Sequence, residues 1–150
     1  MRSLQIKNGD LVLGTRGYAE VTGKDKIVQD LNIAVLTPYG SNRFHPTWGC
    51  TLDSKIGTPQ SALTSQLIST EIKRVVGVLM AQQKAQLQTS QSYGYSSPYN
   101  NADLISGISS ITVTPSYDSV LVNCVVSSAS SQTVTLVASV SPAGVIGTVQ

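Results

Sequence analysis

The segment RFHPTWGC, residues 43–50, gathers most of the side chains in this 150-residue chain that could do chemistry. It contains the only His, the only Phe and the only Trp, and one of the two Cys. A nucleophilic Ser or Cys needs a base beside it, so any such site must use His45. Cys50 follows on the same loop, but no further residue supports a His45–Cys50 pair. The alternative is a packed joint, in which His45 only forms hydrogen bonds within the loop.

The sequence offers even fewer suitable residues for other kinds of active site. Cys50 and Cys124 form neither a C-x-x-C pair nor a zinc-ligand spacing, so we expect free thiols and no metal site. A glycoside hydrolase needs two carboxylates, one with a raised pKa, and the chain has only two Glu. Of these, Glu71 is spaced to pair with Arg74 at i,i+3, as on an ordinary helix surface. With no glycine-rich phosphate motif either, the sequence predicts no catalytic residue and no cofactor.

The composition favours a protein whose surface is covered by partners. Charged residues make up 12% of the chain, about half the usual share, and packed interfaces are depleted in charge. The net charge of +2 comes without a dense basic cluster, so no contact with nucleic acid is expected. No apolar run approaches the ~20 residues of a membrane span, and the first ten residues do not form a signal peptide. We therefore expect the chain to fold in a cytoplasm, away from membranes.

Two helices must position the loop. The stretch LQIKNGDLVL predicts two short strands around Asn8-Gly9, and Tyr18–Val21 a further extended piece. A helix of about 13 residues should then begin with Thr22 as its N-cap and end before Pro38. Its apolar stripe comprises Ile27, Val28, Leu31, Ala34 and Val35.

The second helix should be longer and form the backbone of the core. It begins at Thr58-Pro59, with Thr as the cap and Pro at the first helical position. Its wide apolar stripe comprises Leu63, Leu67, Ile68, Ile72, Val75, Val76 and Leu79. Gly77 lowers helix stability by roughly 1 kcal/mol relative to Ala, so we expect it to mark a point of close packing. The polar segment at about 86–107 that follows is either a flexible insertion or, through Tyr93, Tyr95 and Tyr99, an interface.

The last third of the chain alternates with period 2 and predicts three antiparallel strands. The inward side chains are Val120, Val122, Cys124 and Val126, then Val134, Leu136, Ala138 and Val140. Residues 1–150 thus form one α+β domain with two helices on a small antiparallel sheet and a tail at about 141–150 that is either loose or bound by a partner. The strand TVTLVASV has neither charge nor Pro, so we expect an open edge for strand addition at Thr133, Val134, Thr135, Leu136 and Val137.

The order of these motifs resembles the baseplate wedge, or sheath-initiator, family of phage tails, whose relatives include a baseplate component of type VI secretion systems. The first helix carries the pattern Gly23, Lys26, Ile27, Gln29, Asp30 and Leu31. It ends in Leu36-Thr37-Pro38-Tyr39-Gly40, and the loop Pro46-Thr47-Trp48-Gly49 follows. In this reading Pro46 and Gly49 shape the turn, while Phe44 and Trp48 anchor it against the helices. The likeness covers residues 4–84 and, at the level of pattern, 108–140.

The resemblance implies a structural subunit, not an enzyme. Copies would form a ring around the tail tube in the virion baseplate, join wedge subunits, and present an edge on which the sheath or next tail ring starts. The chain departs from the family where the long helix ends, with Met80–Gln83 in place of Glu-Pro-Arg, and in the longer polar segment. Two alternatives remain open: a peptidoglycan-degrading baseplate lysozyme, an older label of the family, and a regulatory binding module on the same fold.

Overall fold

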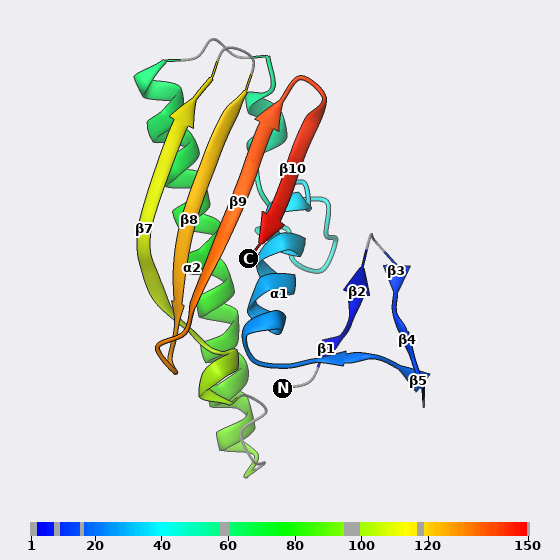
Figure 1. Cartoon of the computed structure of the whole chain (residues 1–150). Coiled ribbons are helices and arrows are strands. Elements are labelled where there is room, and N and C mark those ends of the chain that lie inside the picture. Colours follow the sequence, from blue (N-terminus) through cyan, green and yellow to red (C-terminus); the bar gives the residue numbers. More distant parts are fainter. Residues whose placement is uncertain are drawn as a thin grey trace.

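Two helices cover one face of a four-stranded antiparallel sheet in the computed structural model of the chain, and a group of short strands projects beside them (Figure 1). The structure describes residues 3–7, 10–15, 17–57, 61–94, 100–116 and 119–149. The α+β class expected from the sequence is confirmed, since one face of a small antiparallel sheet carries both helices.

Helix α1 spans Lys24–Leu36 and has the predicted length of 13 residues. Its fully buried apolar residues are Ile27, Leu31, Ala34 and Val35, and Val28 is partly buried. The predicted cap at Thr22 is wrong by one residue. Gly23 occupies the N-cap position at φ +65° without a side-chain cap, and its N–H donates to the buried carboxylate of Asp103 instead. A distant carboxylate therefore takes the place of a local cap.

Helix α2 spans Ala62–Ser92, and Ser61 caps it by accepting the Thr64 N–H. The cap expected at Thr58-Pro59 lies outside the described residues. The predicted stripe is buried at Ile68, Ile72, Val75, Val76 and Leu79. It is exposed at Leu63 (65%) and Leu67 (46%), so the stripe is narrower than expected over the first turns.

The polar segment after Lys84 is not a separate insertion at its start, because α2 continues to Ser92. Gln, Ala and Lys are good helix formers, so a polar composition does not end the helix there. A short 3-10 helix, η2 (Asn101–Asp103), precedes the sheet, and another, η1 (Leu52–Lys55), precedes α2.

Gly77 is not a close-packing point, contrary to the expectation. It is an exposed residue of α2, and a Cβ built on it meets no atom within 4 Å. The Gly77→Ala variant should therefore gain about 1 kcal/mol of unfolding free energy, because only the backbone-entropy term changes. Urea denaturation measures this gain in unfolding free energy. Gly57→Ala is the contrast: the space there is also open, but φ is +76°, so that variant should lose stability.

The sheet has strands in the order β10-β9-β8-β7. Its strands are β7 (Ile105–Pro115), β8 (Val120–Ser128), β9 (Thr133–Ser141) and β10 (Gly144–Val149). Every inward residue predicted for β8 and β9 is buried at 4% exposure or less. The three-strand count and the loose tail are wrong, because residues 144–149 pair with β9 from Gly144↔Ser141 to Val149↔Leu136.

Residues 3–21 form an N-terminal module of six two-residue strands, paired as three short ladders. The strands are β1 (Ser3–Leu4), β2 (Ile6–Lys7), β3 (Asp10–Leu11), β4 (Leu13–Gly14), β5 (Gly17–Tyr18) and β6 (Glu20–Val21). The ladders are β1–β6, β2–β3 and β4–β5, and the second is the predicted hairpin, whose Asn8-Gly9 turn lies outside the described residues.

The three ladders meet in a closed cycle of backbone hydrogen bonds. Gln5 N–H donates to Ala19 O (2.8 Å), Ala19 N–H to Val12 O (2.8 Å), and Val12 N–H to Gln5 O (2.9 Å). Among the described residues of this module only Val21 is buried, so backbone bonding rather than a core of its own holds the module together.

Candidate functional site

The loop that carries RFHPTWGC folds back on the end of α1. Thr37 O accepts the Cys50 N–H (2.8 Å), Cys50 O accepts the Tyr39 N–H (2.9 Å), and Trp48 O accepts the Gly40 N–H (3.1 Å). Gly49 lies at this crossing with φ +98°, and a Cβ there would come within 2.6 Å of the carbonyl oxygens of Thr37 and Pro38. The turn-forming role expected of Gly49 is therefore a steric requirement.

Arg74 of α2 clamps this loop from the other side. Its guanidinium donates to Gly49 O (2.6 Å) and Thr47 O (3.2 Å), and to both carboxylate oxygens of Glu71 (2.7 and 2.8 Å). Glu71 also accepts the Thr51 N–H (2.8 Å). The pair expected as ordinary surface pairing is thus a joint between loop and helix. The sequence indicated the Glu71–Arg74 pair but not its contacts with the loop, because the two loop acceptors are backbone carbonyls.

The environment of Glu71 keeps it ionised. Its hydrogen bonds with Arg74 are the largest influence, and the Thr51 N–H adds to them, so the pKa falls from 4.5 to about 2 against the opposing effect of burial. Arg74 also stacks over the Tyr39 ring, 4.8 Å from its centroid. A carboxylate held in this state suits a structural ion pair and not a general acid.

His45 and Cys50 do not form a nucleophile–base pair in the described part of the chain. Cys50 is buried at 3% exposure, and that burial raises the pKa of its thiol to about 11. His45 is exposed, and its backbone forms the loop turn with Asn42 and Trp48. Cys124 is a second free, buried thiol, whose pKa burial also raises to about 11. Thiols in this state are poor nucleophiles near neutral pH.

The two aromatic residues of the loop differ in burial. Trp48 is half-buried and packs against the core, as expected. Phe44 is 87% exposed, so its predicted role as an anchor is wrong. The Asn42 side chain accepts the N–H groups of Phe44 and His45 (3.0 and 3.2 Å), and this turn leaves the Phe44 ring at the solvent-facing tip.

Gln29 joins α1 to the N-terminal module. Its side-chain amide accepts the Ile6 N–H (2.8 Å) and donates to Leu4 O (2.9 Å), as a paired strand would. The next residue, Asp30, forms an ion pair with the buried Lys26 one turn earlier in the helix. Burial raises the pKa of Asp30, and Lys26 opposes that rise. The residues that carried the family resemblance in this helix therefore make structural contacts.

Replacing Gln29 with Ala should loosen the N-terminal module without unfolding the rest. Two hydrogen bonds to partly exposed backbone disappear, so we expect a loss of about 1 kcal/mol or less in global stability. Amide exchange at Ile6 should accelerate about fivefold or more. Hydrogen exchange read by mass spectrometry checks this, with Gln88→Ala on the exposed face of α2 as the control. Equal exchange in both variants would refute the proposed link.

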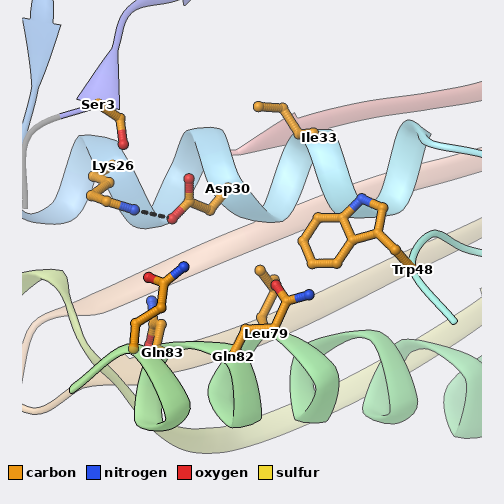
Figure 2. Close-up of a pocket in the computed structure, with 9 residues that line it drawn as sticks. Ser3, Lys26, Asp30, Ile33, Trp48, Leu79, Gln82 and Gln83 are labelled. Atoms are coloured by element: carbon orange, nitrogen blue, oxygen red, sulfur yellow. Dashed lines mark hydrogen bonds and ion pairs between the residues drawn. The ribbon is translucent and has the colours of Figure 1, made fainter. Parts of the chain in front are cut away.

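A cavity of about 190 Å³ lies between α1 and α2 (Figure 2). The Lys26–Asp30 pair lines one part of it, and Trp48 another. Gln83, which also lines the cavity, donates to Asp103 O (3.1 Å) and accepts the Ile105 N–H (3.0 Å). Its amide thus fixes the start of β7 to α2.

Within the ranges that the structure describes, no group of three or more His, Cys, Asp or Glu could hold a metal ion. Neither helix in those ranges combines the length and apolar character of a membrane-crossing segment.

The predicted interaction residues fall into two groups. Tyr93 is 73% exposed at the end of α2, whereas Tyr95 and Tyr99 lie outside the described residues. The open edge expected at Thr133–Val137 is wrong for Leu136 and Val137, which pair with β10 as well as with β8. Thr133, Val134 and Thr135 pair with β8 and have no partner in β10 among the described residues. Within β9, Val134 and Leu136 are fully buried. The missed signal is the short run after Pro142, which forms β10 and covers the edge of β9 from Leu136 to Ser141.

Compared with known proteins, the chain matches no family model, no curated protein and no solved structure. The resemblance to the baseplate wedge family therefore stays a prediction. Its residues lie where the loop and the N-terminal module are joined to α1, and that geometry is the basis for a functional proposal.

Proposed function

We propose that the chain is a structural, non-enzymatic subunit of a phage or phage-like tail baseplate. It is assembled in the cytoplasm of the bacterial host, joins wedge subunits around the tail tube, and nucleates sheath or tail assembly through protein contacts. Its partners are other wedge subunits, tube and sheath proteins, and copies of itself.

The observation that carries this proposal is the apolar surface of the N-terminal module. Large apolar side chains here lie in solvent: Leu4 (46%), Ile6 (40%), Leu11 (41%), Leu13 (77%) and Tyr18 (57%). Ile6 lies opposite Leu11 and Leu13 lies opposite Tyr18 in the ladders, so these exposed side chains lie together in pairs. Exposed apolar side chains gathered in this way mark a protein contact. The module projects from the helices and sheet, where a partner can reach it (Figure 1).

The contacts of the family-type residues support the same role. Gln29 fixes the module to α1, Gly49 permits the loop crossing, and Trp48 packs on the core. Each builds a rigid platform, and none faces a group that could act as its catalytic partner. A platform that presents an apolar module suits an assembly subunit.

Of the edge predicted for strand addition, only Thr133–Thr135 lies beyond β10, and β7 offers a longer edge. The free lateral strand of the sheet at one side is β7, which pairs only with β8 among the described strands. It has no charged residue over its length. Register shifts at Ile105/Gly107 and Ile108/Ser110 interrupt its first half, so the regular stretch from Ile111 is where a partner strand would pair.

The hydrolase alternative has little support from the site. Its best carboxylate, Glu71, is committed to Arg74 and has a pKa of about 2, whereas the acid in glycoside hydrolysis needs a raised pKa. No observation specifically favours the regulatory-module alternative.

Deletion of the gene, followed by complementation, tests the proposal. Particles from the deletion should lack a complete baseplate, and the wild-type gene should restore it. The double variant Leu11→Asp/Leu13→Asp should fold but fail to restore assembly, whereas Gln88→Asp should restore it. Complete tails without the protein would refute the proposal, as would clearing of a cell-wall suspension that Glu71→Gln abolishes.

A further inference from the structure

We propose that copies of this chain join head to tail, with the first turns of α2 of one copy seated in a groove beside α1 of the next. This names the self-contact within the proposed tail role and rests on that role for its setting. The proposal is argued from two exposed apolar features that do not pack against the rest of the fold.

The first feature is a groove of about 750 Å³ between the N-terminal module and α1. Its α1 wall runs along the helix at Val28, Asn32, Ile33 and Leu36, a second stripe beside the core stripe. Ile33 and Leu36 are 37% and 47% exposed, and Ile6 on the opposite wall is 40% exposed. Lys7 and Asp25 also line the groove, so its apolar part is the stretch of α1 from Val28 to Leu36 together with Ile6 and Val21.

The second feature is the exposed start of α2. Leu63 and Leu67 are spaced i,i+4, so they project from the same face of the helix, and neither is in the buried core. Residues 61–70, SALTSQLIST, carry no charge, so burying them desolvates no ionised group. This is the pattern of an apolar helix face that seats in a groove.

The groove favours a helix over a strand as its occupant. The backbone of its module wall is already bonded by the Gln29 amide at Ile6 N–H and Leu4 O, so an added strand finds no row of free groups there. Side-chain packing is what this wall can still offer.

The two features lie on opposite sides of the molecule, with the start of α2 beside the far end of the sheet from the N-terminal module (Figure 1). A chain cannot fill its own groove with this helix end. Two different surfaces in contact make a heterologous interface, which closes into a ring or extends as a filament.

Sedimentation equilibrium of the purified full chain tests this with two double variants. The helix variant, Leu63→Asp/Leu67→Asp, keeps the groove intact; the groove variant, Ile33→Asp/Leu36→Asp, keeps the helix intact. Wild type should show an average mass that rises with concentration above 15.8 kDa. Each variant alone should be monomeric, and an equal mixture should give one heterodimer and nothing larger. Leu121→Asp, on the other face of the sheet, should associate like wild type, and circular dichroism should show every variant folded.

Three results would overturn the inference. One is a wild type that stays monomeric up to about 1 mM, where even a millimolar contact is substantially formed. The second is a mixture of folded variants that stays monomeric, and the third is association of either variant alone. None of these three results contradicts the proposed tail role, because the chain can still be present in particles. Absence from particles with self-association intact would remove the tail role alone.

Discussion

Replacing Gly49 with Ala should lower the free energy of unfolding by about 2–4 kcal/mol, the largest effect expected from a single methyl group in this chain. The added Cβ would lie 2.6 Å from the carbonyl oxygens of Thr37 and Pro38, and φ of +98° is unfavourable for any L side chain. Both oxygens belong to backbone that is itself bonded across the crossing, so neither can move away easily. Urea denaturation of the purified variant measures the loss.

Gly40→Ala is the matched control. Its φ is +75°, but the nearest atom to an added Cβ is Pro46 O at 3.7 Å, which is ordinary contact. The Gly40→Ala variant should therefore lose about 1 kcal/mol of unfolding free energy, the conformational cost of a positive φ for a residue with a Cβ. Equal losses at Gly40 and Gly49 would show that the crossing is not as tight as described.

Glu71→Gln should cost about 1.5–3 kcal/mol at neutral pH, because it leaves the Arg74 charge half-buried without its counter-ion. The amide can still accept one of the hydrogen bonds but cannot balance the charge. Loop residues 47–51 depend on this pair through three backbone contacts, so the loss should be accompanied by faster amide exchange at Thr51. Urea denaturation and hydrogen exchange check the two effects.

The same variant should change how stability depends on pH. The folded pKa of Glu71, about 2, lies below its ordinary value of 4.5, so its contribution is complete above about pH 4.5 and is lost as pH falls towards 2. Wild type should lose stability in that window, and Glu71→Gln should lose less. Asp53→Asn, which removes an exposed carboxylate in η1, should change neutral-pH stability by less than about 0.5 kcal/mol. Parallel wild-type and Glu71→Gln curves would contradict the clamp.

Local pattern was enough to predict the elements whose burial follows a simple period. The inward residues of β8 and β9 are correct because a half-buried strand needs only alternation, and α1 is correct because its stripe recurs at helical spacing. The same logic failed for β10, a short strand with two Gly that gains its stability from pairing with β9. Whether an edge is covered depends on such tertiary pairing, which the pattern of β9 alone does not contain.

The candidate site was harder to predict than the fold. Composition shows that Phe44 and Trp48 are both large and apolar, but only the turn at Asn42 decides which of them reaches the core. The Arg74 clamp depends on backbone carbonyls at Thr47 and Gly49, which every residue has. The Gln29 contacts are likewise to backbone groups of the N-terminal module. Contacts of this kind leave no mark in residue types or spacing.

The central claim is that this chain is a structural part of a tail baseplate, and direct localisation tests it most plainly. Electron microscopy of purified particles that carry a tagged copy of the chain should show label at the baseplate end of the tail, in several copies around the tube. Mass spectrometry of the same particles should detect the protein at a fixed ratio to the tube protein. Particles with complete tails and no label, in cells that express the tagged chain, would contradict the account.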